Sequence, residues 1–303
     1  MSVPTSRASG YAEVLIDHEL CTTCGICVEV CKGGPLYIQD DRLRVDQTIG
    51  FGCIACGACA AACPTDAIRI SGRDLFPEDI TRVPPRSTRA EYDALHALLV
   101  SRRSTRKFSQ RAIDPDVIVM ILESASTAPA GIPPTDVGVL VFRTPAAISS
   151  LRDNLLDSIK HWPMIFSPTL MTLLRPFIGR ENADMFGKFI RPAVKTFLEK
   201  RSQGIDWLLY DAPLVLYFYG TAYNDPADTV VAATLAMMAG ESLGLGTCML
   251  GFPGSIFQYS KAVRRKYGLP NKIQPGLAVI FGYPKYPIHN AVKRRFREVR
   301  ECE

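Results

Sequence analysis

Two runs of closely spaced cysteines near the start of the chain constrain its fold more than any other feature. The stretch CTTCGICVEVC ends at Cys31, and the stretch CIACGACAAACP begins at Cys53. Both follow the pattern C-x-x-C-x-x-C-x-x-x-C, and together they hold eight of the ten cysteines of the 303-residue chain. A region of about sixty residues buries only a small apolar core, so we expect the thiols themselves to hold this part of the chain together.

The spacing within each run is typical of a cubane iron-sulfur cluster. Three close cysteines wrap three corners of such a cluster, and the fourth cysteine of the run ligates the other cluster. The alternative is zinc, which would use pairs of C-x-x-C and leave thiols over; the duplicated run that ends in Cys63-Pro64 favours clusters. The predicted ligand sets are Cys21, Cys24, Cys27 and Cys63 for one four-iron four-sulfur cluster, and Cys53, Cys56, Cys59 and Cys31 for the other.

Residues 11–70 as a whole resemble the bacterial ferredoxin with two four-iron clusters. The resemblance rests on the two cysteine runs and on the proline after Cys63. One departure is that Cys31 is followed by Lys-Gly-Gly, with a proline only at Pro35. The first residues lack the apolar region of an export signal, so we expect a reducing, cytoplasmic setting rather than a secreted disulfide scaffold.

Charge is unevenly distributed along the chain. Residues 11–70 carry eight Asp or Glu and four Lys or Arg, a balance of −4, whereas residues 71–303 carry +8. An acidic first part gives no reason to expect nucleic-acid binding there, and the basic excess fits either a solvated surface or an anion site. The longest apolar stretch, residues 163–178, contains three prolines and an arginine. It is shorter than the roughly 20 residues of a membrane span, so none is predicted.

The remainder of the chain has the pattern of a larger α+β domain. Residues 71–90 contain three prolines and no clear periodicity, which predicts a linker. From residue 91 to 303, helical spacing alternates with buried strands bounded by Gly and Pro. The predicted helices are one that starts after Glu91, one at Asp114–Ser126 with Asp114 as N-cap, and one within 225–246 that Gly244 and Gly246 end; the predicted strands are 136–142, 212–220 and 276–284.

Four stretches of this domain, taken in order, carry a second resemblance. SRRSTRKF, at residues 101–108, offers forked donors and a hydroxyl to a phosphate, although by itself it fits a solvated helix end as well. It is followed by ASTAPAGIPPTDVGVLVF, by GESLGLGTCMLGFP, and by LAVIFGYP with VKRRF close behind. This ordered set resembles the nitroreductase family of FMN flavoproteins over about residues 90–300.

The second resemblance implies a mixed sheet flanked by helices, a homodimer, and FMN at the subunit interface. It implies that the flavin phosphate and ring edge are held by Arg102, Arg103, Ser104 and Arg106, joined by Arg294 or Arg295. It also implies contacts to the isoalloxazine ring from Pro129, Ala130, Gly131, Ile132 and Pro133, and from the backbone of Cys248, Met249, Leu250 and Gly251. The chain departs from the family pattern after Pro133, where Pro134 and Thr135 follow instead of a Gln-Pro pair. Cys248 itself fits a small apolar residue better than a reactive thiol.

No catalytic acid or base is identified from the sequence. The four histidines form no spaced pair, and none of them is assigned a role. Residues 145–210 form a longer connection than many family members have, and they are predicted to be an apolar insertion. This insertion fits a lid over the substrate face of the flavin, or additional core or dimer contacts. Its large apolar residues are Trp162, Met164, Phe166, Met171, Phe177, Met185, Phe186 and Phe189.

Together these features predict an iron-sulfur flavoprotein oxidoreductase. Clusters carry single electrons, so a flavin is needed to deliver a pair to an organic acceptor. The electron donor is expected to be a ferredoxin or NAD(P)H, and the acceptor a small apolar or aromatic molecule such as a nitroaromatic or a quinone. The alternatives are an ene-reductase or reductive dehalogenase on the same flavin, or an electron-transfer adaptor without a substrate of its own.

Overall fold

The computed structural model describes residues 3–302 and divides into two compact units. The sequence predicts two domains separated by a single linker. In the structure, two segments from later in the chain belong to the first unit by their contacts. The first unit contains the chain up to Ala90 together with Pro129–Gly138 and Gly220–Asp228, and the second contains Glu91–Ala128, Val139–Tyr219 and the chain from Thr229 onward. The boundaries 11–70, 71–90 and 91–303 stay a prediction.

Two antiparallel strand pairs and two short helices form the cysteine-rich part of the first unit. Its core combines apolar side chains such as Leu36, Leu43 and Ile70 with buried cysteines. The short helices contact one another. The elements are β1 (Glu13–Ile16) paired with β4 (Ile68–Ser71), β2 (Leu36–Gln39) paired with β3 (Arg42–Val45), and the helices α1 (Ile26–Val30) and α2 (Ala58–Ala62).

The sequence repeat is also a repeat of backbone conformation. Gly25 and Gly57 precede the two helices with φ of 79° and 75°. Thr23 and Ala55, between the first two cysteines of each run, also have positive φ, at 54° and 61°. Such left-handed positions reverse the chain sharply. Each run therefore folds back on itself, which turns its cysteines toward a common volume.

The Lys-Gly-Gly sequence after Cys31 permits a close approach of two loops. A Cβ atom at Gly33 would collide with the carbonyl oxygen of Gly52, and one at Gly50 would collide with the carbonyl oxygen of Gly33. The amide of Phe51 donates to that same carbonyl of Gly33 at 3.1 Å. The departure from the ferredoxin pattern thus has a packing reason, since the loop after the first run lies directly on the loop before the second.

Residues 71–90 contain only short elements and are mostly exposed. Gly72 and Leu75 form an isolated bridge, and the 3-10 turns η1 (Pro77–Asp79) and η2 (Arg86–Thr88) follow.

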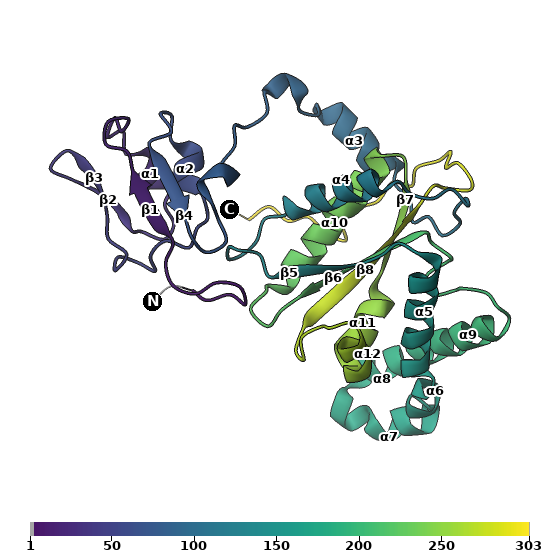
Figure 1. Cartoon of the computed structure of the whole chain (residues 1–303). Helices are drawn as coiled ribbons and strands as arrows, with labels where there is room; N and C mark the ends of the chain where they lie inside the picture. Colours follow the sequence, from purple (N-terminus) through teal and green to yellow (C-terminus); the bar gives the residue numbers. More distant parts are fainter. Residues whose placement is uncertain (1–2, 303) are drawn as a thin grey trace. The chain divides into compact units, whose positions relative to one another are not determined.

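A four-stranded sheet forms the centre of the second unit, and all three predicted strands are present in it. Its order is β5 (Val137–Phe142), β6 (Leu214–Gly220), β8 (Gln274–Gly282) and β7 (Gly246–Leu250), with β7 antiparallel to β8. Figure 1 shows α4 (Pro115–Ser126) and α10 (Pro226–Ser242) along one face, and α5 (Pro145–Ile159), α11 (Gly251–Tyr259) and α12 (Lys261–Lys266) on the other. The domain is therefore α+β, as expected.

The predicted helices are confirmed, with one correction at the end of α10. Asp114 occupies the N-cap position of α4, but its side chain makes no capping hydrogen bond. Helix α10 ends at Ser242, and Gly244 follows with φ of 79°. Gly246 does not end the helix, because it is already the first residue of β7.

The stretch 145–210 consists mainly of helices and has two different parts. Its first helix, α5, belongs to the core: Leu155 and Ile159 are fully buried, and such side chains contribute about 1.5–3 kcal/mol each. The apolar addition therefore begins after α5. It comprises α6 (Trp162–Ile165), α7 (Pro168–Ile178), α8 (Arg180–Asp184), the π-helical turn η3 (Met185–Ile190) and α9 (Arg191–Ser202).

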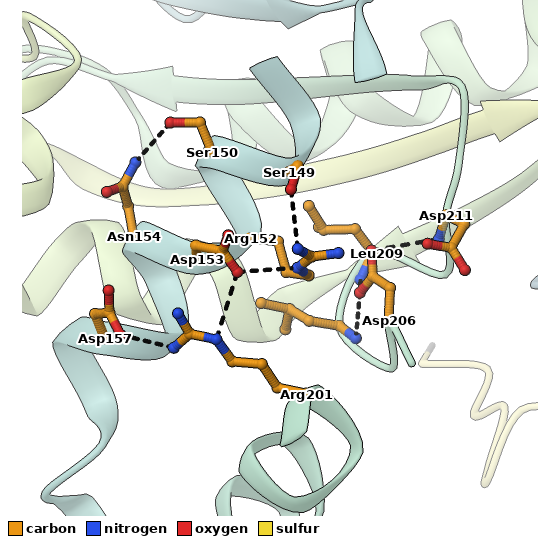
Figure 2. Close-up of polar contacts among 11 residues, drawn as sticks. Ser149, Ser150, Arg152, Asp153, Asn154, Asp157, Arg201, Asp206, Leu209 and Asp211 are labelled. Carbon is orange, nitrogen blue, oxygen red and sulfur yellow. Dashed lines mark hydrogen bonds and ion pairs between the residues drawn. The ribbon is translucent and has the colours of Figure 1, made fainter. Parts of the chain in front are cut away.

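A pair of ionic contacts fixes the end of this addition to the core helix α5. Arg201 of α9 lies 2.6 Å from Asp157 and 3.4 Å from Asp153 (Figure 2). The hydrogen bond between Arg201 and Asp157 raises the pKa of the arginine and lowers the pKa of the carboxyl group. Because these side chains are partly exposed, each contact stabilises the fold by about 1 kcal/mol or less.

In the described part of the chain, residues 3–302, no helix is both long enough and apolar enough to cross a membrane.

Candidate functional site

Four cysteines line each of two small cavities in the first unit. One cavity is surrounded by Cys21, Cys24, Cys27 and Cys63, and the other by Cys31, Cys53, Cys56 and Cys59. Each set takes three members from one run and one from the other. This grouping matches the predicted ligand sets, while the ligand roles themselves stay a prediction.

Both cavities combine four thiols with apolar walls. Among the described residues 3–302, no three His, Cys, Asp or Glu side chains are placed to hold one ion. The four thiols of each set instead surround a space with apolar walls. Ile26, Ile38 and Leu43 line the first cavity, and Ile54 and Ile70 line the second. Soft thiolates in an apolar, nearly dry shell are the environment of iron-sulfur clusters.

Burial affects how readily these thiols lose their protons. It raises the pKa of Cys59 to about 12, and it also raises the pKa of Cys27 and Cys53. For Cys63, burial alone would raise the pKa, but hydrogen bonds from Thr65 and Ala67 outweigh it and lower the pKa. A group bound in these cavities must therefore displace protons from at least three buried thiols, as metal binding does.

In the second unit, the arginine-rich segment lies beside the start of β7. The amide of Thr105 donates to the carbonyl oxygen of Thr247 at 2.8 Å, and Ser104 forms a parallel bridge with Thr247. A Cβ atom at Gly246 would collide with the side chain of Thr105. Two stretches that are about 140 residues apart in the sequence are thus in contact, and the glycine of GTCML is required for that contact.

The same segment is also attached to the chain that follows β8. The amide of Ser109 donates to the backbone carbonyl oxygen of Tyr283 at 2.8 Å. The amide of Lys285 donates to the backbone carbonyl oxygen of Lys107 at 3.0 Å. Buried Thr105 and Phe108 face the interior of the unit, whereas Arg106 is exposed. The segment therefore presents its basic side chains from a backbone that is fixed at both ends.

Among the predicted phosphate residues, Arg102 and Arg103 are half-buried, and Ser104 and Arg106 are exposed. The guanidinium of Arg106 lies 5.8 Å from the ring centroid of Tyr210. Burial raises the pKa of Tyr210, and the charge of Arg106 opposes that rise. Tyr210 was not predicted from the sequence; its backbone has φ of 60°, and the next residue, Asp211, has φ of 51°.

Glu241 is a second residue of this site that was not predicted. Its carboxylate accepts hydrogen bonds from the amide of Thr247 at 3.1 Å and from the hydroxyl of Thr247 at 2.7 Å. Burial raises its pKa, while those bonds and the charge of Arg102 act in the opposite direction. A sequence signal existed, because Glu241 is the only Asp or Glu between residues 229 and 297.

Glu241→Gln should make the protein more stable at neutral pH. Because the folded-state pKa of Glu241 is raised above its ordinary 4.5, the stability that this group contributes is present below pH 4.5 and is lost as pH rises through the folded value. Glutamine accepts the same two hydrogen bonds without a buried charge, so the variant should lack this loss. Thermal unfolding midpoints between pH 5 and pH 8 test this, with exposed Glu123→Gln as the control. A lower midpoint for Glu241→Gln at pH 7 would mean that attraction to Arg102 outweighs burial.

The remaining predicted flavin residues lie in three places. Residues 129–133 belong to the first unit, where the amide of Gly131 lies 3.4 Å from the Asp228 carboxylate. Cys248 is fully buried, Met249 and Leu250 are half-buried, and Gly251 opens α11. Arg294 and Arg295 lie in an exposed C-terminal segment, and the described part of the chain offers them no ion pair or hydrogen bond.

A further cavity in the second unit has a polar wall but no predicted residue. It lies between the start of α5 and the loop before β6, beside Arg152 and Asp206 (Figure 2). The carboxylate of Asp206 already accepts three backbone amides, and Arg152 donates to Ser149 and Asp153. These groups are satisfied by the protein itself, so we assign no ligand to this cavity.

Comparisons with known proteins identify one domain in the cysteine-rich part of the chain and another in the part that follows it. The model of the nitroreductase family matches residues 99–283, and a 4Fe-4S dicluster domain model matches residues 13–69. An uncharacterised ferredoxin of Methanocaldococcus jannaschii is 39% identical over 59 residues, which are 19% of this chain and 77% of the relative. A seven-iron ferredoxin of Hydrogenibacillus schlegelii is 35% identical over 68 residues, 22% of this chain and 81% of the relative.

The fold of the second unit is also found in a solved structure. A nitroreductase of Bacteroides fragilis, solved with bound FMN, superposes with a TM-score of 0.52 at 15% identity and covers 69% of this chain and 98% of its own. This chain belongs to the nitroreductase family, and its nitroreductase domain follows a ferredoxin domain of the 4Fe-4S dicluster type.

Proposed function

We propose that this protein is an iron-sulfur flavoprotein oxidoreductase that takes up electrons singly through two four-iron four-sulfur clusters and passes them by way of FMN to an organic acceptor. The observation that carries the proposal is the sorting of eight cysteines into two crossed sets of four, in the same chain as a nitroreductase domain. A bound flavin supplies the conversion between one-electron and two-electron transfer.

The protein residues hold and orient these groups. Each crossed set of cysteines supplies four thiolates, and the apolar walls of each cavity exclude water from the sulfur atoms. In the second unit, Arg102, Arg103, Ser104 and Arg106 supply donors for the flavin phosphate from a backbone fixed by Thr247. Ring contacts are assigned to Pro129, Ala130, Gly131, Ile132 and Pro133 and to Cys248–Gly251, of which Cys248 can contribute only its backbone, because its side chain is fully buried.

A homodimer is part of the proposal, and two exposed apolar surfaces support it. Leu95 and Leu99 of α3 (Tyr92–Ser101) are 47% and 49% exposed, and Phe296 in the C-terminal segment is 86% exposed. Apolar surfaces of this kind mark contacts with another molecule. A second copy of the chain can cover them, and the same contact can bring Arg294 or Arg295 to a flavin phosphate.

The acceptor is proposed to be small and apolar or aromatic, such as a nitroaromatic or a quinone. The support is the aromatic character of α6–α9, where Phe166 and Phe186 stack with ring centroids 4.8 Å apart while Phe177 and Phe189 stay largely exposed. The buried aromatic residues of α6–α9 are consistent with an extension of the hydrophobic core. The exposed ones are consistent with a lid over the flavin or with a dimer contact. The donor is proposed to be a reduced ferredoxin or NAD(P)H.

Metal and flavin analysis of anaerobically purified protein tests the proposal. We expect about eight iron atoms and one FMN for each chain. About seven iron atoms would indicate that one site holds a smaller cluster, and zinc in place of iron would overturn the cluster assignment. Turnover of a nitroaromatic, a quinone, an activated alkene and a haloaromatic, each with NADH, NADPH and reduced ferredoxin, then identifies the reaction. Reduction of none of them by flavin-loaded protein would favour an electron-transfer adaptor.

A further inference from the structure

Arg73, which follows strand β4, is a buried arginine that the cysteine and flavin assignments leave without a role. Its residue is only 7% exposed. Its guanidinium donates to four backbone carbonyl groups, two in the N-terminal arm, one in the second cysteine run and one in the segment Pro129–Gly138. The acceptors are Ile54 at 3.2 Å, Gly10 at 2.9 Å, Val3 at 2.8 Å and Pro133 at 2.9 Å.

The backbone that places Arg73 is unusual. Gly72, Arg73 and Asp74 have φ of 103°, 53° and 63°, so two consecutive non-glycine residues lie in the left-handed region. Such conformations are unfavourable for these side chains and persist where the surroundings hold them, often at functional sites. Here the four hydrogen bonds hold the turn, and the turn directs the arginine inward.

The charge of Arg73 lacks a carboxylate partner. Within residues 3–302, the structure gives it no ion pair, whereas neighbouring Asp74 pairs with Arg7 at 2.9 Å. Carbonyl groups stabilise a guanidinium by hydrogen bonding but do not neutralise it. A buried cation is costly unless a negative group lies close to it.

Contacts of Arg73 identify which of the two cavities supplies that negative charge. Ile54, whose carbonyl accepts from Arg73, directly follows Cys53 and lines the cavity with Cys31, Cys53, Cys56 and Cys59. A cluster there, bound by four thiolates, is an anion. The negative charge of the cluster and the positive charge of Arg73 attract each other strongly, because the interior between them is poorly solvated.

The corresponding turn of the first repeat has the opposite charge. Strand β2 stands in the first repeat where β4 stands in the second, and β2 is followed by Asp40 and Asp41 with φ of 51° and 55°. Both aspartates are exposed. The two cavities are thus similar in backbone conformation but differ in electrostatics, since among residues 3–302 only the second has a buried cation beside it.

The bond to Pro133 joins this cavity to the loop that the proposed function places against the flavin ring. Asp136, close to Pro133 in the sequence, is also bonded to the N-terminal arm. Its buried carboxylate accepts hydrogen bonds from the amide and the hydroxyl of Ser6 at 2.8 Å and 2.5 Å. The N-terminal arm and Arg73 therefore hold residues 129–136 to the part of the first unit that contains Cys53.

We propose that Arg73 is a positioning residue that makes the cluster of Cys31, Cys53, Cys56 and Cys59 the last electron carrier before the flavin. Its charge stabilises the reduced, more negative form of that cluster and so raises its reduction potential above that of the other cluster. Its bond to Pro133 holds the flavin loop beside the same cluster. The inference rests on the proposed function, in which a one-electron donor supplies two electrons in succession, each transfer oxidising the last cluster by one electron, and solvent supplies the protons.

Redox titration of the intact, cluster-loaded protein tests this role. Arg73→Gln removes the charge and keeps a hydrogen-bond donor, whereas Arg73→Lys keeps the charge and loses the forked guanidinium donors. Exposed Arg69→Gln, on the preceding strand β4, is the control for net charge. The two cluster signals are followed by electron paramagnetic resonance at controlled potential. They are assigned with Cys24→Ser and Cys56→Ser, which alter one exposed ligand in each set.

We expect Arg73→Gln to shift the potential of the second cluster to more negative values and to leave the first cluster unchanged. Arg73→Lys should keep the potential near that of the wild type. Both variants should increase hydrogen-deuterium exchange of residues 129–136, because the bond to Pro133 is lost, and Arg69→Gln should change neither quantity.

Equal shifts of both clusters, no shift in Arg73→Gln, or unaltered exchange of residues 129–136 would overturn the inference. If Arg73→Gln does not assemble its clusters, Arg73→Lys decides: an unchanged potential with faster exchange supports the role, and a negative shift overturns it. Failure of the proposed function is separate, because it would appear in wild-type protein that lacks iron or FMN.

Discussion

Cys56→Ser should abolish turnover that is driven by a one-electron donor such as reduced ferredoxin, and it should lower the iron content from about eight to about four atoms per chain. Cys56 is an exposed member of the second cysteine set. Loss of this ligand interrupts the route to the flavin. FMN binding should persist because the arginine segment, which supplies the proposed phosphate donors, lies in the other unit, although the proposed ring loop does not. Donor-specific rates in an anaerobic assay, with iron and flavin analysis, measure both effects.

The matched control for this variant is Cys302→Ser. Cys302 is also exposed but lies outside both cysteine runs, so its substitution should leave iron, flavin and all rates unchanged. An artificial donor that reduces flavin directly should still support turnover in Cys56→Ser. Ferredoxin-driven rates equal to those of the wild type would show that the clusters do not supply the flavin.

Arg102→Ala should weaken FMN binding by about one to two orders of magnitude. The expectation follows from the roughly 1.5–3 kcal/mol of a hydrogen bond to a charged group, with about 1.4 kcal/mol for each factor of ten. Arg102 is half-buried and is the C-cap residue at the end of α3. Fluorescence titration of flavin-depleted protein with FMN measures the dissociation constant.

Arg265→Ala is the control for the arginine substitution, because Arg265 is an exposed arginine on α12 of the same unit. It should bind FMN like the wild type. Equal affinities for Arg102→Ala and the control, with unchanged circular dichroism, would leave SRRSTRKF as an ordinary solvated helix end. A loss of affinity in both would point to net charge rather than to a defined phosphate site.

Local patterns in the sequence were sufficient for part of the secondary structure of the second unit and for the division of the cysteines. The spacing of each run, the glycines at 25 and 57 and the repeat itself act over a few residues, and the backbone repeats them faithfully. The strands and α4 were predictable for the same reason, because a run of buried residues or an Asp-Pro pair defines an element with its neighbours alone.

The predictions were least complete where the same composition fits two environments. The apolar residues of α3 form a helix, but Leu95 and Leu99 are exposed in the single chain. Conversely, α5 lies in a stretch that the sequence marks as an insertion, yet Leu155 is fully buried in the core. Periodicity identifies an apolar face without identifying what covers it.

The sequence by itself determined that this chain has two cysteine sets and an arginine-rich segment before an α+β domain, because spacing and residue type are local properties. Only the tertiary structure decided which residues support them. Glu241 meets Thr247 through a helix end and a strand, and Arg73 gathers carbonyls from Val3 to Pro133. Such contacts join segments up to 70 residues apart, and their free energy depends on burial and direction, which no short stretch of sequence encodes.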